Sequence, residues 1–312
     1  MKIVFLDAKT IGEDIDLSGF DELGEVVKYG FSTAEEARER SKDADVLVLN
    51  KVQVNEQTIG AAKHLKLVCV TATGTNNLDK EYLAKQGIEW RNVAGYSTES
   101  VAQHTFAMLF YLLEKLPYYD NYVKSEKYVN DVSFTHFAKA FHELSGKTYG
   151  IIGLGNIGRR VADIAKAFGC HVIYYSTSGR NSQPGYERVS FDELLERSDI
   201  VSIHAPLDEN TLGLMNQNAF AKMKSSAILL NVGRGPIINE ADLAEALNNR
   251  TIAAAGLDVL SVEPMQPENP LRGIKDSERL LITPHIAWAG VEARMRLMDI
   301  ILNQIKEFFA FS

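Results

Sequence analysis

The chain has little cysteine and no long hydrophobic run, and each absence excludes a class of protein. Cys69 and Cys170 are its two cysteines; they lie in or beside apolar runs and lack the spacing of metal ligands. We expect both to be small core residues, and we predict no metal site and a reducing compartment, the cytoplasm. At the start, the apolar run Ile3–Leu6 ends at an acid and is too short for a signal-peptide core or a membrane span. We therefore predict no membrane partner.

Basic residues are not concentrated anywhere in the chain. The formal net charge is −8 and no cluster of Lys and Arg occurs, whereas a nucleic-acid surface needs a basic face. We therefore predict no nucleic-acid partner, although local cations can still bind an anionic substrate. What the chain does have is 312 residues with 46% hydrophobic and 24% charged side chains, enough for two globular domains with a core each.

Two series of short apolar runs alternate with amphipathic stretches, the pattern of parallel sheets covered by helices. In the first series we expect strands at Lys2–Leu6, Val46–Leu49, Leu67–Thr71 and Ile88–Asn92, and helices at Ala34–Ser41, Glu56–Lys63 and Lys80–Gln86. In the second we expect strands at Thr148–Ile152, His171–Tyr175, Ile200–His204, Ala227–Asn231, Ile252–Leu257 and Leu280–Ile282. The predicted fold class is α/β, with two Rossmann-like domains and parallel sheets.

Two further helices and one irregular segment complete the chain. A nearly all-apolar stretch from Thr98 to about Leu116 is expected to be a buried helix. The last helix, roughly Val291–Phe309, follows the final strand and has no place in the second series; its return to the first domain would make that domain discontinuous. Between about Pro117 and Ser145 the sequence is aromatic-rich and poorly periodic, which indicates either an arm that packs on a partner subunit or a cap over its own domain, and we favour the arm.

The run Gly153-Leu154-Gly155-Asn156-Ile157-Gly158 stands between an apolar strand and an amphipathic helix, as a pyrophosphate-binding turn must. Gly153 allows the tight turn, Gly155 lets the backbone approach the pyrophosphate, and Gly158 lets helix and strand pack closely. The helix N-terminus, with Asn156 and Ile157, supplies free N–H groups and a partial positive charge to the phosphates. We infer a dinucleotide site; a glycine turn without a ligand is the alternative.

The next strand should end in an acid if the cofactor is NAD, because that acid binds the ribose hydroxyls. Here the strand ends in Ser176-Thr177-Ser178-Gly179-Arg180, with no carboxylate. The hydroxyls and Arg180 are suited to a 2′-phosphate, which an acid would repel. Alternatively, Ser176 binds a ribose hydroxyl and both cofactors are accepted. The cofactor is therefore predicted as NAD(H) or NADP(H).

Charged residues follow three apolar strands of the second series, where open α/β sheets place their sites. Arg234 lies between two glycines, and its guanidinium is suited to bind a carboxylate by two parallel hydrogen bonds. Asp258 and Glu263 follow the next strand, and His285 follows the last. Each alone has an ordinary structural explanation, but the three groups together favour a catalytic site.

With these segments, the sequence resembles the D-isomer-specific 2-hydroxyacid dehydrogenases over nearly its full length. The glycine turn and the segments of Arg234, Glu263 and His285 occur in the order of that family. The stretches Gly-Tyr-Ser-Thr-Glu-Ser, from Gly95, and Pro-His-Ile-Ala-Trp-Ala, from Pro284, are most similar to the glycerate dehydrogenase (hydroxypyruvate reductase) branch.

The resemblance implies a role for each matching residue. It assigns Arg234 to the substrate carboxylate and carbonyl, His285 to proton transfer and Glu263 to holding His285. It places Asp258 and the Val232 backbone at the nicotinamide carboxamide, and the loop Thr73-Gly74-Thr75-Asn76 at the substrate carboxylate. Pro206 and Thr211 are also predicted to contact the cofactor. Other histidines, such as His104 and His204, are expected to be structural.

The resemblance also implies a domain plan. Residues 1–98 and 287–312 would form the substrate domain, and residues 99–286 the dinucleotide-binding domain. The substrate would lie in the cleft, whose closure excludes water. A homodimer is implied as well, in agreement with the aromatic arm.

The residue types predict the chemistry independently of the resemblance. Reduction of a 2-keto acid leaves an alkoxide that must be protonated at once. An imidazolium at His285 can donate that proton near neutral pH, and an adjacent carboxylate favours its charged form. Arg234 neutralises the substrate and polarises its carbonyl. Hydroxypyruvate or glyoxylate is the expected substrate.

Other functions remain open at this point. A phosphoglycerate dehydrogenase is the stronger rival among enzymes, and a hydroxyphenylpyruvate or lactate reductase is also possible. A formate dehydrogenase is disfavoured, because that branch lacks the partner that Glu263 supplies. A cofactor-sensing protein, like the corepressors of the same family, represents another functional class, because fold alone does not define function.

Overall fold

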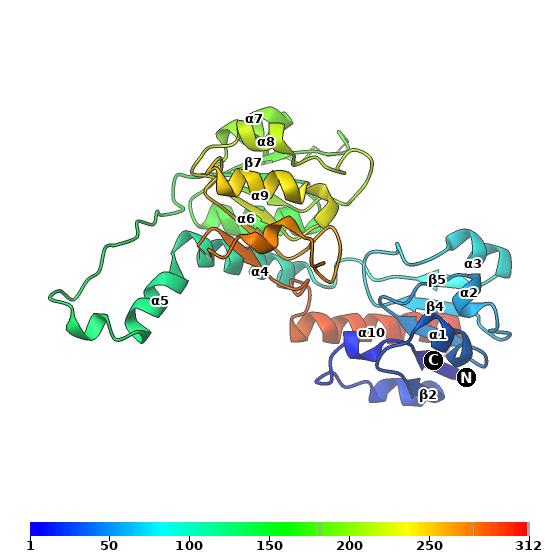
Figure 1. Cartoon of the computed structure of the whole chain (residues 1–312). Coiled ribbons are helices and arrows are strands. Elements are labelled where there is room, and N and C mark those ends of the chain that lie inside the picture. The colour runs from blue at the N-terminus through cyan, green and yellow to red at the C-terminus, as the bar shows by residue number, and fades with distance from the viewer. Residues whose placement is uncertain (181, 277, 311–312) are drawn as a thin grey trace. The chain divides into compact units, whose positions relative to one another are not determined.

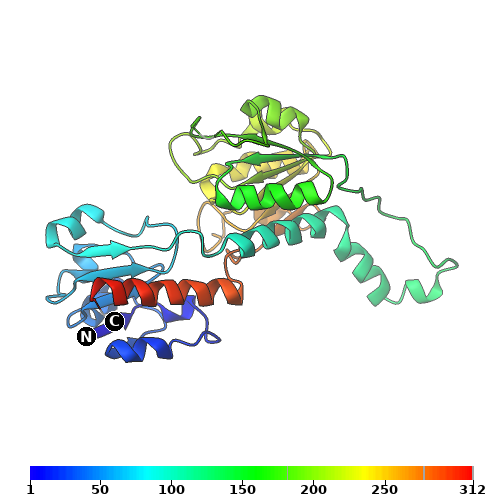
Figure 2. The ribbon, with the colours of Figure 1, turned by 180° about the vertical axis from the view of Figure 1, so that it is seen from behind.

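The computed structural model describes residues 1–180, 182–276 and 278–310, which form two compact units. Unit 1 contains Met1–Ser97 and the chain from Ala289 on, so it is discontinuous in sequence. Unit 2 is the continuous segment Thr98–Trp288. Each unit is a parallel sheet flanked by helices (Figures 1 and 2), which confirms the predicted α/β class.

Unit 1 has a five-stranded sheet in the order β2-β1-β3-β4-β5. Its strands are β1 (Lys2–Phe5), β2 (Glu25–Lys28), β3 (Val46–Leu49), β4 (Leu67–Val70) and β5 (Glu89–Arg91), and all neighbours pair in parallel. Its helices are α1 (Ala34–Arg40), α2 (Glu56–Ile59), α3 (Lys80–Gln86) and α10 (Val291–Phe308). The three inner strands β1, β3 and β4 are almost wholly buried, as their continuous apolar runs require.

Helix α10 is bonded to the rest of unit 1 by polar groups along its length. The guanidinium of Arg294 donates to both carboxylate oxygens of Asp14, and that of Arg296 donates twice to the carbonyl of Tyr96. Near the other end, the Gln304 side chain donates to the carbonyl of Asn92. A buried stripe of five residues, Ala293, Leu297, Met298, Ile301 and Ile305, supplies the apolar face that a packed amphipathic helix needs.

At the end of β1, the side chain of Asp7 is buried and bonds to the loop after β3. Its carboxylate accepts hydrogen bonds from the backbone N–H groups of Asn50 and Lys51 at 2.7–3.0 Å, and from that of Val52 at 3.3 Å. Burial raises the pKa of Asp7, and these backbone donors oppose the rise. The loop after β3 is thereby fixed to the first strand.

Unit 2 has a seven-stranded parallel sheet in the order β12-β11-β10-β9-β6-β7-β8. Its strands are β6 (Thr148–Ile152), β7 (His171–Tyr175), β8 (Glu187–Arg188), β9 (Ile200–Ile203), β10 (Ile228–Asn231), β11 (Ala254–Leu257) and β12 (Leu280–Ile282). Its helices are α4 (Thr98–Leu113), α5 (Leu116–Lys124), α6 (Asn156–Ala167), α7 (Phe191–Arg197), α8 (Gln217–Lys222) and α9 (Glu240–Asn248). Short 3-10 helices connect elements at Ala8–Thr10, Ser18–Leu23, Tyr128–Asn130, Gly235–Ile237 and Pro270–Gly273.

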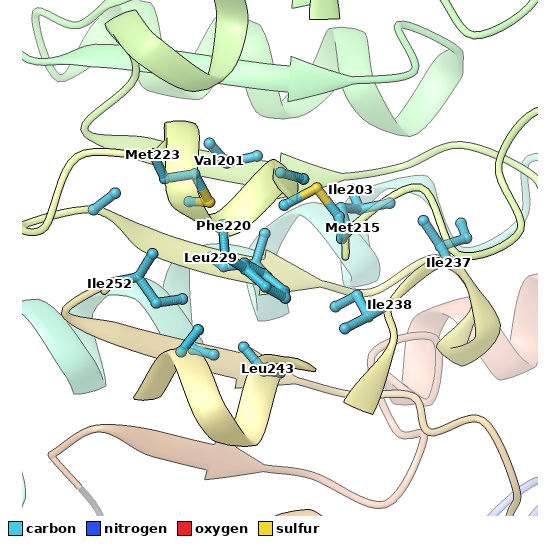
Figure 3. Close-up of a cluster of buried hydrophobic side chains, with 14 of the residues drawn as sticks. Val201, Ile203, Met215, Phe220, Met223, Leu229, Ile237, Ile238, Leu243 and Ile252 are labelled. Carbon is cyan, nitrogen blue, oxygen red and sulfur yellow. The ribbon is translucent and has the colours of Figure 1, made fainter. Parts of the chain in front are cut away.

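Two hydrophobic clusters lie in the core of the described part of unit 2. One packs residues of α4 and α6 against β6, β7 and β10, and the other packs residues of α7, α8 and α9 against the sheet. In Figure 3, Phe220 of α8 and Leu229 of β10 lie in the second cluster together with Leu243 of α9. Because each such side chain contributes about 1.5–3 kcal/mol when fully buried, these clusters hold the strand ends in place.

The structure differs from the sequence expectations at a few elements. Strand β2 was not predicted, because only four residues with charged ends form it at a sheet edge; the two-residue edge strand β8 gives even less signal. The long apolar helix ends at Leu113 rather than Leu116. Lys115 then adopts a left-handed conformation, and α5 begins at Leu116 with Pro117 in its first turn. The helix from Glu56 ends at Ile59, before Gly60.

The aromatic segment contains more structure than its irregular pattern indicated. Tyr118, Tyr119 and Tyr122 lie on α5, and Tyr122 stacks on the ring of His136 at 3.7 Å. After α5, Figures 1 and 2 show the chain extending away from the sheet of unit 2 before it returns to β6. Large apolar side chains on this segment, including Phe134 and Phe137, are exposed.

Candidate active site

The strands of unit 2 end in a single row across the sheet. Cα register pairs Ile282 of β12 with Leu257, Leu257 with Asn231, Asn231 with Ile203, Ile203 with Ile152, and Ile152 with Tyr175 of β7. Every predicted cofactor and catalytic residue of unit 2 follows one of these six ends. The order of strands in the sheet therefore collects segments that are far apart in sequence at one edge, where open α/β sheets bind ligands.

His285 and Glu263 form a close pair at this edge. Nδ1 of His285 lies 2.7 Å from Oε2 of Glu263, and Oε1 of Glu263 accepts the Leu260 N–H at 3.0 Å. Both side chains are partly exposed, at 29% and 34%. The carboxylate is thus fixed by a backbone donor on one oxygen and orients the imidazole with the other.

The backbone of His285 has φ of +56°, in the left-handed region that non-glycine residues rarely adopt. Its N–H donates to the carbonyl of Asp258 at 2.8 Å. The buried carboxylate of Asp258 accepts the next two N–H groups, of Ile286 at 2.9 Å and Ala287 at 2.8 Å. Asp258 therefore holds three successive amides of the turn that carries His285.

Arg234 follows β10 in extended conformation and is half-buried. Its loop is held by the buried Asn231, whose side chain accepts the Gly233 N–H and donates to the Arg234 carbonyl, both at 3.0 Å. Among the described residues the guanidinium donates to the Gly233 carbonyl alone, so its other N–H groups are free for a ligand. Asn231 was not predicted, although a polar residue that ends an otherwise apolar strand is a usable signal.

The glycine turn fits a dinucleotide pyrophosphate. Gly153 has φ of +91°, and a Cβ there would lie 2.8 Å from the backbone of Ala205; a Cβ on Gly158 would lie 2.3 Å from the Gly153 carbonyl oxygen. A Cβ on Gly155 would meet nothing within 4 Å, so the space beside this residue is open. Helix α6 begins at Asn156 with no side-chain cap, which leaves its first N–H groups, including that of Ile157, for an anion.

The end of β7 has the polar composition seen in the sequence. Ser176 is buried, Thr177 half-buried and Arg180 exposed. A second guanidinium, of Arg188 on β8, lies beside this turn: its Nη2 would be 3.9 Å from a Cβ on Gly179. Arg188 was not predicted as a site residue, because β8 is too short to be recognised from the sequence.

Two more predicted cofactor residues share the loop after β9. The buried hydroxyl of Thr211 donates to the Pro206 carbonyl and accepts the Asp208 N–H, both at 2.8 Å. Before this loop, Nε2 of His204 lies 2.9 Å from the Ser202 hydroxyl, and its Nδ1 is buried without a partner among the described residues. Burial lowers the pKa of His204 to about 3, so this ring is neutral.

The predicted substrate loop Thr73-Gly74-Thr75 belongs to unit 1, where it follows β4. The Thr73 hydroxyl donates to the Val93 carbonyl at 2.9 Å, and the Asn92 side chain donates to the Thr73 carbonyl at 2.7 Å. Both bonds fix the loop at its start. Within the described ranges, no cluster of His, Cys, Asp or Glu is arranged to hold a metal ion, and no helix has the length and apolarity to span a membrane.

Comparisons with known proteins show which family this chain is similar to. The model of the D-isomer specific 2-hydroxyacid dehydrogenase NAD binding domain matches residues 106–287, which lie within unit 2. The chain is 38% identical to a hydroxypyruvate reductase of Blautia hydrogenotrophica, over 99% of this chain and 97% of that protein. It is 33% identical to a glycerate dehydrogenase of Methylorubrum extorquens, over 99% and 96%.

Solved structures show the same fold. An NADPH-dependent glyoxylate/hydroxypyruvate reductase from Sinorhizobium meliloti, in complex with NADP and malonate, superposes with a TM-score of 0.81 at 26% identity. The match covers 99% of this chain and 94% of that one.

Proposed function

The chain belongs to the D-isomer specific 2-hydroxyacid dehydrogenases, and from that premise we propose that it reduces hydroxypyruvate or glyoxylate to the D-2-hydroxy acid with NAD(P)H. The observation that carries the proposal is the His285–Glu263 pair at the edge where Arg234 also follows a strand end. The names of the similar enzymes support the choice of these two substrates.

His285 is the proton donor in this proposal. With Nδ1 directed at Glu263, the imidazolium donates its Nδ1–H to the carboxylate and has its Nε2 proton to transfer. Glu263 stabilises the charged ring and fixes its orientation, as a carboxylate behind a catalytic histidine does. The proton goes to the oxygen of the substrate carbonyl, where negative charge develops.

Arg234 binds the substrate anion. Its free N–H groups pair with the carboxylate and polarise the carbonyl, and a guanidinium stays charged at every working pH. The N–H groups of Thr73, Gly74 and Thr75 supply further donors for the carboxylate. Unit 1 is accordingly the substrate domain and unit 2 the dinucleotide-binding domain.

The dinucleotide is held by Gly153, Gly155, Asn156, Ile157 and Gly158 at the pyrophosphate. Ser176, Thr177 and Arg180 bind the ribose end; Pro206, Thr211, Val232 and Asp258 lie toward the nicotinamide. When bound, the nicotinamide supplies the hydride for the carbonyl carbon. The open space at Gly155 and the uncapped start of α6 support this placement.

Initial rates for hydroxypyruvate, glyoxylate, pyruvate and phenylpyruvate, each with NADH and NADPH, test the substrate. We expect the first two to give the highest kcat/KM, and His285→Ala, as the control, to show no steady oxidation of cofactor. Higher kcat/KM for pyruvate or phenylpyruvate would refute the substrate assignment. Cofactor binding without turnover of any keto acid by the unmodified chain would favour a cofactor-sensing protein.

The segment after α5 supports a homodimer. Phe134 and Phe137 are 87% and 88% exposed, whereas a cap over its own domain would bury such side chains. A second copy of the chain is the partner that would cover them. We expect Phe134→Ser with Phe137→Ser to convert a dimer into a monomer in sedimentation equilibrium, with Phe31→Ser, an exposed site in unit 1, as the control. A wild-type monomer would refute the proposal.

The compartment proposed is the cytoplasm. Cys69 and Cys170 are free and buried, as in a protein kept in reducing surroundings. Cell fractionation followed by immunodetection tests this assignment, and recovery in a secreted fraction would contradict it.

A further inference from the structure

Helix α4 is mainly apolar and carries one imidazole, that of His104. Its buried residues include Thr105, Phe106 and Leu109, and they pack into the core of unit 2. His104 lies among them with only 19% of its side chain exposed. Its Nε2 is 3.0 Å from the hydroxyl oxygen of Thr283, which follows β12 and comes two residues before His285.

The direction of these hydrogen bonds follows from the number of protons. The Thr283 hydroxyl has one proton and donates it to Oδ1 of Asp258 at 2.6 Å. The Thr283 oxygen is therefore the acceptor toward His104, and Nε2 of His104 carries the donated proton. The result is a directed chain from His104 to Thr283 to the Asp258 carboxylate, and Nε2 of His104 also lies 3.5 Å from Oδ1 of Asp258 itself.

The chain of bonds ends on the group that shapes the His285 turn. Oδ1 of Asp258 is shared by the Thr283 hydroxyl and the Ile286 N–H, and Oδ2 accepts the Ala287 N–H. The carboxylate is 1% exposed, so these donors substitute for water. The position of the Asp258 carboxylate therefore fixes the turn in which the backbone of His285 is left-handed.

We propose that His104 is a positioning residue: through Thr283 and Asp258 it fixes the turn that presents His285 to the substrate. The proposal rests on the proposed function, because it takes His285 as the proton donor. In the described part of the chain, Nε2 of His104 contacts Thr283 and Asp258, and its proposed effect on His285 passes through these two residues.

A double-mutant cycle tests this proposal. His104→Leu and Thr283→Val each remove the hydrogen bond between these two side chains. Each is expected to lower kcat about tenfold, the rate equivalent of one hydrogen bond to a charged network. Because both remove the same link, the double variant should be no slower than the slower single variant. Thr283→Ser keeps the hydroxyl and should retain most of the activity.

The readouts separate positioning from general loss of structure. The dissociation constant for NADPH, measured by fluorescence titration, should change little in the single variants. Thr283→Val should lower the thermal midpoint, because the buried Asp258 loses a donor, so kcat is compared well below the midpoints of all variants. Thr105→Val is the matched control. This threonine lies next to His104 on α4, and in the described part of the chain its hydroxyl bonds within the helix, to the Val101 carbonyl. It should leave kcat unchanged.

Several results would overturn the proposal. Additive losses would mean that the two residues act separately, and wild-type kcat in Thr283→Val would mean that the link has no effect on turnover. A loss confined to NADPH binding would assign the network to the cofactor instead. Each of these outcomes leaves the proposed function intact, whereas full turnover by His285→Ala would refute the proposed function first.

Discussion

Nδ1 of His285 lies 2.7 Å from Oε2 of Glu263, although the two residues come from different loops after β11 and β12. The pair depends on parallel register, because Leu257 and Ile282 are direct neighbours and both loops start from them. A backbone N–H, from Leu260, holds the second oxygen of Glu263. The imidazole is therefore oriented before any substrate arrives.

Removal of either partner should reduce turnover without loss of cofactor affinity. We expect His285→Ala to lower kcat by about 10³-fold, the usual contribution of a positioned proton donor, and Glu263→Gln to lower it less. Stopped-flow single turnovers with prebound NADPH measure the step directly. Weakened NADPH binding in His285→Ala would show that this residue has been assigned the wrong role.

Gly155 provides a test of the dinucleotide site that does not depend on chemistry. Its φ of −79° suits any residue, and a Cβ would meet no protein atom within 4 Å. Gly155→Ala should therefore fold normally but bind NADPH at least tenfold more weakly, because the methyl group occupies the space where the pyrophosphate approaches. Isothermal calorimetry measures the affinity, and thermal melting checks the fold.

Gly146→Ala is the comparison for Gly155→Ala. Gly146 also has open space around it but precedes β6, at the other end of that strand from the glycine turn, and its φ is +75°. We expect a lower thermal midpoint with unchanged NADPH affinity. Equal loss of affinity in both variants would contradict the assignment of Gly155.

The two guanidiniums at the turn after β7 should favour NADPH. Arg180→Ala and Arg188→Ala should each raise the KM for NADPH about tenfold, since each removes a cation that pairs with a 2′-phosphate, and should leave the KM for NADH unchanged. Arg250→Ala is the control, because Arg250 follows α9 and lies outside the turn after β7. If all three variants give the same KM for NADPH as the unmodified chain, these residues do not select the cofactor.

His204 should make unit 2 sensitive to acid. Its pKa is about 3 in the folded chain against the ordinary 6.5, so between these values the unfolded chain binds a proton that the folded chain does not. The contribution of His204 to the free energy of unfolding is therefore fully present above pH 6.5. It is lost as the pH falls toward 3, by up to about 1.4 kcal/mol per pH unit. Urea denaturation at pH 7, 5.5 and 4.5 measures the slope.

His204→Gln removes the titration and should give a flatter dependence of the unfolding free energy on pH. His171→Gln, at an exposed residue of β7, is the matched control and should keep the wild-type slope. An unchanged slope in His204→Gln would mean that the neutral ring is not the source of the acid sensitivity.

Apart from the edge strand β8, sequence reasoning located the strands of unit 2 within two residues, because continuous apolar runs bounded by glycines and charges define buried parallel strands. It also selected Arg234, Glu263 and His285 as candidates, since each follows such a run, and their catalytic roles stay predictions. It could not find Arg188, whose place depends on a two-residue edge strand.

The links among His104, Thr283 and Asp258 were equally out of reach, because they depend on side-chain directions across 179 positions of sequence. A lone histidine in an apolar helix has no pattern that names its partner. Sheet order, which tertiary packing decides, brings these residues together.

The Asp7 carboxylate makes the two units differ in whether an anionic ligand can bind at the end of the first strand. In unit 1 it accepts amides between the ends of β1 and β3, where the strand order reverses; in unit 2 the corresponding position, between β6 and β9, has the glycine turn. Unit 1 thus supplies its own anion where unit 2 leaves room for the phosphates of a ligand. We therefore expect one dinucleotide for each chain, despite two sheets of related topology.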